Sequence, residues 1–140
     1  MSFEAFAPHG PWTSAAALVA RVIFAAVFLM AAGFKFAGMG DTAGYIAAAG
    51  FRFPLLLASV AAFFEVVLAI GLLTGAWLSE VAIVAAAYIL FLAFSFHGPE
   101  RWEGNQVEFG FFVDHFTFIA GLLFASAHGP GRWAVRTGAR

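Results

Sequence analysis

Several ionisable side chains lie within or at the ends of long apolar stretches, and six of them are the residues of this sequence best suited to do chemistry. They are Arg21, Lys35, Glu65, His97, Asp114 and His115. A charge inside a bilayer is costly unless it is paired, hydrated or neutralised, so such residues usually mark a buried pair, a ligand site or a proton route.

The apolar stretches that hold these residues predict four transmembrane helices, over residues 15–36, 54–77, 79–96 and 109–127. Each stretch is close to the roughly 20 residues that a helix needs to cross about 30 Å of hydrocarbon. They are continuously apolar rather than alternating, which disfavours a β-barrel. The composition, 63% hydrophobic and 11% charged, also disfavours a soluble bundle. We therefore predict an all-α integral membrane protein, an antiparallel four-helix bundle forming one domain over residues 1–140 in contact with the lipid bilayer.

The first connection has structure of its own. Asp41 is suited to be an N-cap, residues 45–49 can form a short helix, and Gly50 can end it. Pro54 then suits the first turn of the second membrane helix. We expect a short helix at the membrane interface or folded back onto the bundle.

Four spans place both termini on the same side of the membrane. The basic tail, residues 128–140, follows the last span, and Trp133 is its expected interface anchor. The Lys and Arg counts of the two sides are equal: Arg132, Arg136 and Arg140 against Lys35, Arg52 and Arg101. Because the basic tail adjoins the last span, cytoplasmic termini are favoured.

Arg21 and Glu65 are predicted to pair between the first two membrane helices. Arg21 lies about 9 Å and Glu65 about 14 Å from the terminal side of the hydrocarbon, at 1.5 Å rise per residue. Small residues on the same faces, Ala58, Ala61, Ala62 and Ala69 among them, would let the helices approach closely. The pair could serve function, or it could only fix helix register.

A second group, Lys35, His97, Asp114 and His115, falls near the loop side of the membrane. Lys35 alone is more often an anchor at the membrane boundary than a ligand. No His-x-x-x-His or Glu-x-x-His spacing supports a metal site, so none is predicted. Several of the Phe residues could line a slot for a flat quinone ring, with Asp114 or His115 as its proton partner.

Other functions are disfavoured by what the sequence lacks. A net charge of −1 provides no basic footprint for nucleic acid, and without cysteine the chain cannot do thiol–disulfide chemistry. No phosphate loop, nucleophile elbow or haem-attachment motif appears.

The ionisable residues and the glycines around them together resemble the DoxX family. The resemblance rests on Arg21, the run Gly33-Phe34-Lys35, Tyr45-Ile46, Gly50, Pro54, Glu65, Gly71, Gly75 and His97. Two features depart from the family pattern. Three residues separate Gly50 from Pro54, a longer spacing than usual, and Val113-Asp114 stands where many members have a Lys-Asn pair.

The resemblance implies a four-helix protein of the bacterial inner membrane and a redox context, since a related subunit serves thiosulfate:quinone oxidoreduction. We expect a membrane subunit of an oxidoreductase system, with quinone as the one cofactor considered, and a protein partner or a homo-oligomer. Two alternatives stay open: a non-enzymatic anchor, assembly factor or chaperone for a partner protein, and a small-solute transporter.

Overall fold

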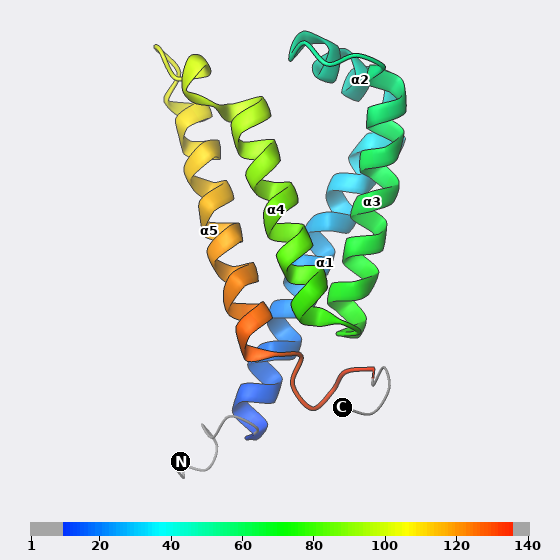
Figure 1. Cartoon of the computed structure of the whole chain (residues 1–140), viewed down its shortest axis with the longest axis vertical. Helices are drawn as coiled ribbons and strands as arrows, with labels where there is room; N and C mark the ends of the chain where they lie inside the picture. The colour runs from blue at the N-terminus through cyan, green and yellow to red at the C-terminus, as the bar shows by residue number, and fades with distance from the viewer. Residues whose placement is uncertain (1–9, 136–140) are drawn as a thin grey trace. The chain divides into compact units, whose positions relative to one another are not determined.

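The computed structural model describes residues 10–135, which form helices joined by irregular connections, with no strand among them (Figure 1). The elements are α1 (Pro11–Ala37), α2 (Met39–Ala48), α3 (Pro54–Thr74), α4 (Leu78–His97), the short 3-10 helix η2 (Pro99–Arg101) and α5 (Gln106–His128). α1, α3, α4 and α5 are long and apolar enough to cross a membrane. The prediction of an all-α membrane protein with four transmembrane helices is confirmed.

Prolines and glycines set most of the helix ends. Pro11 opens α1, four residues before the predicted start, and Pro54 opens α3 where it was predicted. Proline suits a first turn because the missing N–H has no intrahelical partner there. α3 ends at Thr74 rather than at residue 77, because Gly75 adopts a left-handed conformation with φ of 74°.

The short helix in the first connection is confirmed, but its predicted cap is wrong. α2 begins after Gly38, which is the N-cap, and Asp41 lies within the first turn. A carboxylate there is still favourable because the helix N-terminus carries a partial positive charge. Gly50 follows the helix with φ of 86°, as predicted for its stop. α2 folds back against α3 and buries Ile46.

The chain divides into two compact units. Unit 1 is Met1–Leu78 with Pro130–Arg140, and unit 2 is Ser79–Gly129. A single domain over residues 1–140 stays a prediction. Of the predicted basic tail, Arg136 and Arg140 lie outside the described residues, whereas Arg132 and Trp133 are exposed.

In unit 1, α1 and α3 run in opposite directions and contact each other along their lengths (Figure 1). Small residues permit the close approach: Ala25, Ala58, Ala62 and Ala69 are at most 2% exposed. They follow the helical spacing that the sequence predicted for the inward faces. This contact positions the charged residues of unit 1.

In unit 2, α4 and α5 run in opposite directions (Figure 1). Aromatic rings of the two helices contact each other. The Phe94 ring lies edge-on to the rings of Phe112 and Phe116, with centroids 5.2 and 6.3 Å apart. At the other end of these helices the Ser79 hydroxyl donates to the Ser126 carbonyl over 2.7 Å. Large rings therefore fill the space between these helices at the His97 end.

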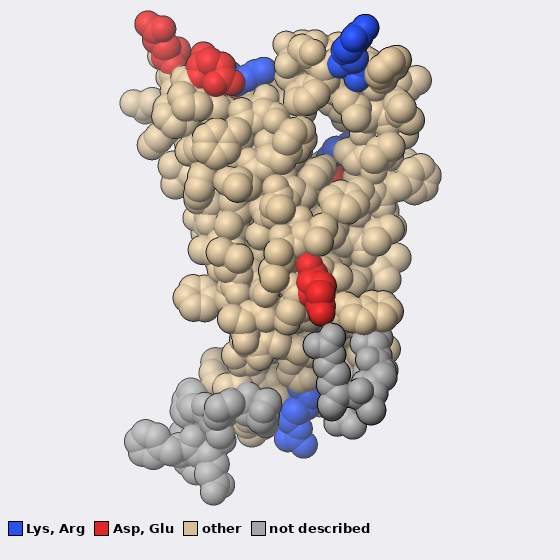
Figure 2. Space-filling view, viewed as in Figure 1, with Lys and Arg blue, Asp and Glu red and all other residues tan. Residues whose placement is uncertain are grey.

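Apolar side chains form most of the exposed surface. On the face drawn in Figure 2, acidic and basic side chains are few and uncharged residues cover most of the area. Large side chains such as Phe63, Val67 and Phe124 are more than 60% exposed. Apolar area of this extent on four spans of membrane length is what lipid contact requires.

Candidate functional site

Arg21 is buried in unit 1, with 3% of its surface exposed. Its guanidinium donates to four backbone carbonyls. Nε bonds Leu72 over 3.0 Å and Nη2 bonds Leu73, both in the last turn of α3. Nη1 bonds Pro130 over 2.9 Å and Trp133 over 2.7 Å. Arg21 therefore satisfies carbonyls at the end of α3 and ties the segment 130–135 to the helices.

The predicted pair of Arg21 with Glu65 is wrong. Both residues are buried, as predicted, but Glu65 lies seven residues before Leu72 on α3, which is about 10 Å along the helix axis. The prediction assumed that the ends of the two helices were level. In the structure Arg21, ten residues into α1, meets the last turn of α3, so α1 extends well beyond the end of α3.

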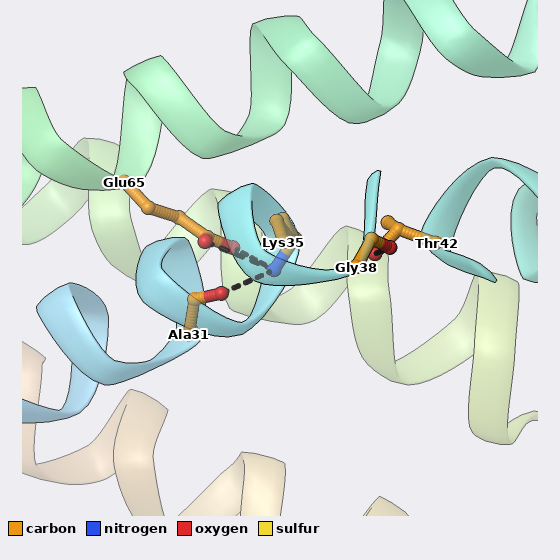
Figure 3. A network of polar contacts seen from close by, with 5 residues as sticks. All are labelled: Ala31, Lys35, Gly38, Thr42 and Glu65. Carbon is orange, nitrogen blue, oxygen red and sulfur yellow. Dashed lines mark hydrogen bonds and ion pairs between the residues drawn. The ribbon is translucent and has the colours of Figure 1, made fainter. Parts of the chain in front are cut away.

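Glu65 instead forms an ion pair with Lys35 (Figure 3). The ammonium Nζ lies 2.8 Å from Oε1 and 2.9 Å from Oε2, so both carboxylate oxygens accept from it. The Glu65 side chain is 2% exposed and that of Lys35 is 21% exposed. The carboxylate of Glu65 is therefore neutralised inside the α1–α3 contact.

Lys35 reaches this position because side chains on a helix lean toward its N-terminus. Nζ also lies 3.4 Å from the carbonyl of Ala31, one turn earlier in α1 (Figure 3). The interpretation of Lys35 as an anchor that extends to the membrane boundary is therefore wrong. Its position relative to the residues of unit 2 stays a prediction.

A second polar cluster lies in unit 2, where α4 ends and α5 begins. The Nδ1 atom of His97 is 2.7 Å from Oε2 of Glu108, and the rings of His97 and His115 have centroids 5.0 Å apart, tilted by 47°. Phe111 flanks His97 with a centroid separation of 5.3 Å. The structure brings together two of the four residues that were predicted to gather near the loop side.

Hydrogen bonds define which ring nitrogen of each histidine carries a proton. Nδ1 of His115 lies 2.6 Å from the carbonyl oxygen of Phe111, and a carbonyl only accepts, so Nδ1 donates. The Glu108 carboxylate likewise accepts from Nδ1 of His97. In their neutral forms both imidazoles therefore keep an unprotonated Nε2 that can accept a hydrogen bond or bind a cation.

The connection between α4 and α5 supports this cluster. The indole Nε1 of Trp102 donates to the carbonyl of His97 over 2.8 Å, and its ring lies edge-on to Phe112 at 4.9 Å. Asn105 caps α5 by accepting from the N–H of Glu108 over 3.3 Å. These contacts fix the end of α4 and the first turn of α5, which carry His97 and Glu108.

Asp114, the remaining predicted site residue, is exposed on α5. Among the described residues it makes no hydrogen bond or ion pair, although His115 adjoins it in sequence. Within residues 10–135, no group of three or more His, Asp or Glu side chains is arranged to hold a metal ion.

Three contributions were missed by the sequence analysis: Glu108 as the partner of His97, Trp102 as its support, and the segment 130–135 as the partner of Arg21. The spacing of Asn105 and Glu108, which matches a helix N-cap and its third residue, could have indicated the start of α5 at Gln106. No local pattern links Arg21 to carbonyls more than a hundred residues away.

A comparison with protein-family models finds the DoxX family, over residues 16–98. The match runs from the first turns of α1 to the end of α4, so it contains Arg21, Lys35, Glu65 and His97 and covers more than half of the chain. No curated protein and no solved structure matches the chain. The match covers most of α1 and all of α2, α3 and α4, and the chain belongs to the DoxX family.

Proposed function

We propose that this protein is a membrane subunit of an oxidoreductase system and that unit 2 binds the head group of a quinol at His97 and His115. The observation that carries the proposal is the pair of neighbouring imidazoles whose Nδ1 atoms are each held by an oxygen. The link of the DoxX family to membrane oxidoreductases supports the redox context.

The hydrogen-bonding capacity of the two rings suits a quinol. A neutral imidazole with its proton on Nδ1 offers Nε2 as an acceptor, and a quinol hydroxyl is a donor. After it has taken a proton, the same nitrogen becomes a donor and suits the carbonyl of a quinone. One ring can therefore bind both members of the couple and exchange a proton with them.

Glu108 favours this exchange at His97. A carboxylate that accepts from Nδ1 orients the ring and stabilises the imidazolium that forms when Nε2 is protonated. The Glu108 side chain is 20% exposed and that of His97 is 18% exposed. Water can therefore reach the carboxylate, and the proton can leave toward the connection between α4 and α5.

The surrounding rings suit a flat, apolar head group. Phe111 is 46% exposed beside His97, and the Phe112 ring contacts Trp102, whose indole donates to the His97 carbonyl. Aromatic rings stack favourably at centroid separations of about 4.5–7 Å. The two electrons of the quinol are taken by a redox centre of the partner oxidoreductase, while unit 2 binds the head group and accepts its protons.

Quinol binding is tested by titrating the protein in lipid nanodiscs with a short-chain quinol under reducing conditions and following tryptophan fluorescence. We expect saturable quenching that is lost in Trp102→Phe and at least about tenfold weaker binding in His115→Phe, which removes the acceptor nitrogen. His128→Phe, at the far end of α5, is the matched control and should bind as wild type does. Absence of saturable quenching, with no quinone co-purified, would reject the proposal.

A second candidate function, a non-enzymatic membrane partner, is favoured by Asp114. An acidic residue eight positions into a membrane-length helix normally faces an opposite charge, a hydrogen-bond donor or water. Asp114 has no hydrogen bond or ion pair within residues 10–135, so a partner helix could supply one. Cross-linking in native membranes discriminates: a stoichiometric partner that Asp114→Asn releases favours this role, and unchanged recovery rejects it.

The proposed location is the bacterial inner membrane, with both termini in the cytoplasm. The segment 130–135 lies against α1 through Arg21, and the basic tail favours the cytoplasmic side. Reporter fusions to the C-terminus test the orientation. Reporter activity typical of an exported domain would reverse it.

A further inference from the structure

The Nε2 atoms of His97 and His115 have no hydrogen-bond partner within residues 10–135, although the other nitrogen of each ring is bonded. The rings come from two different helices, α4 and α5, and their centroids lie 5.0 Å apart with the ring planes tilted by 47°. We propose that these two nitrogens form a binding site for a divalent transition-metal ion. The site uses the lone pairs that the proposed function assigns to a quinol, but it does not depend on quinol binding.

The bonding of the two rings is the arrangement that metal-binding histidines have. A histidine that ligates a metal through one nitrogen almost always donates the other N–H to a carboxylate, a backbone carbonyl or water. Here His97 donates to the Glu108 carboxylate and His115 to the Phe111 carbonyl. Both rings are therefore oriented, and both keep the ligating nitrogen unprotonated.

The ring separation also fits a shared ion. A metal bound to imidazole at about 2.0–2.1 Å lies about 3.2 Å from the ring centroid, on the line through Nε2. Two centroids 5.0 Å apart then subtend about 100° at the metal. That angle lies between the roughly 90° of octahedral or square-planar ions and the roughly 109° of tetrahedral zinc. A tilt of 47° is compatible with a shared ion, because coordination through Nε2 does not prescribe the angle of a ring plane about its metal–nitrogen bond.

The ligand type selects the metal. Imidazole nitrogen suits copper, nickel, zinc and iron, whereas magnesium and calcium require oxygen ligands. Two side chains leave at least two positions to water or to another small ligand, since no group of three or more ligating side chains occurs within residues 10–135. The site should therefore take copper(II) most tightly, then zinc and nickel, and exchange the ion readily.

The test uses full-length protein in detergent that carries no histidine tag. Copper(II) is titrated in, and electron paramagnetic resonance reports nitrogen couplings from bound imidazole; zinc is then added to displace it. We expect one copper per chain with two equivalent imidazole nitrogens. His97→Gln and His115→Gln should each lose one of the two nitrogens and bind at least about tenfold more weakly, whereas His128→Gln should bind as wild type does.

Glu108→Gln separates a ligand site from chance contact with histidine. It keeps both imidazoles and removes only the carboxylate that orients His97. Loss of such a partner lowers metal affinity about 10–100-fold, so we expect a loss of at least tenfold in Glu108→Gln. If His97→Gln fails to fold, His115→Gln and Glu108→Gln carry the same test.

Two outcomes would overturn the site: copper binding with the same affinity in His115→Gln as in wild type, or a spectrum with a single bound imidazole in the wild type. The metal site and the proposed quinol binding can be rejected independently of each other. Copper binding without quinol binding supports the site alone, and quinol binding without copper binding rejects it. If both bind, zinc should displace the quinol because they share Nε2.

Discussion

The ion pair of Lys35 and Glu65 can be tested with a double-mutant cycle. Lys35→Met leaves the Glu65 carboxylate, which is 2% exposed, without its ammonium. Removing one partner of a buried pair typically costs about 3–5 kcal/mol in the free energy of unfolding. Glu65→Gln leaves Lys35, which is 21% exposed and can turn outward, so its cost should be smaller, about 1–3 kcal/mol.

The double variant removes both charges and should lose about 3 kcal/mol, whereas the single losses sum to about 4–8 kcal/mol, so the coupling between the two residues is about 1–5 kcal/mol. Reversible unfolding in mixed micelles with increasing denaturing detergent measures each free energy. A matched cycle of Arg21→Lys with Glu65→Gln should be additive within about 0.5 kcal/mol, because Arg21 bonds carbonyls near the end of α3. Additivity in the first cycle, or coupling in the second, would refute the assignment of partners.

Three further variants test other parts of the structure. Lysine has no planar guanidinium and cannot donate to four carbonyls, so Arg21→Lys should lower the free energy of unfolding by about 2–4 kcal/mol. It should also speed amide hydrogen exchange over residues 130–135. Unchanged exchange there would contradict the proposed role of Arg21 in holding this segment. Gly75→Ala forces φ of 74° on alanine and places its Cβ 2.8 Å from a side chain, so thermal unfolding should show a loss of about 1–3 kcal/mol. Gly33→Ala, with open space around it, is the control and should be neutral or stabilising. Trp102→Phe removes the indole hydrogen bond to the His97 carbonyl and should lower the free energy of unfolding by about 1 kcal/mol. Unchanged stability would show that this bond contributes nothing to folding.

The fold could be predicted from the sequence because it depends on composition. Four apolar stretches of membrane length leave only helices as spans, and Pro54 and Gly50 mark local boundaries by their own backbone preferences. The N-cap was wrongly predicted at Asp41 because acidic residues are favoured both at the N-cap and in the first turn that follows it.

The polar contacts could be predicted only in part, because they depend on how far one helix extends past another. The burial of Arg21 and Glu65 followed from helical spacing, but their partners did not. Arg21 meets the last turn of α3 only because about ten residues of α1 extend beyond the end of α3, and the periodicity of the sequence does not predict this offset. The approach of His97 to His115 follows from the antiparallel course of α4 and α5, which residues 98–105 connect. The bond of His97 to Glu108 depends on α5 starting at Gln106.

The central claim is that both imidazoles hold their proton on Nδ1 and present Nε2 as an acceptor. Solid-state ¹⁵N NMR of histidine-labelled protein in lipid, at a pH where the rings are neutral, measures this directly, with His97→Gln and His115→Gln used to assign the signals. The structure predicts protonated Nδ1 and unprotonated Nε2 at both residues. A protonated Nε2 on neutral His97 or His115 would contradict the claim.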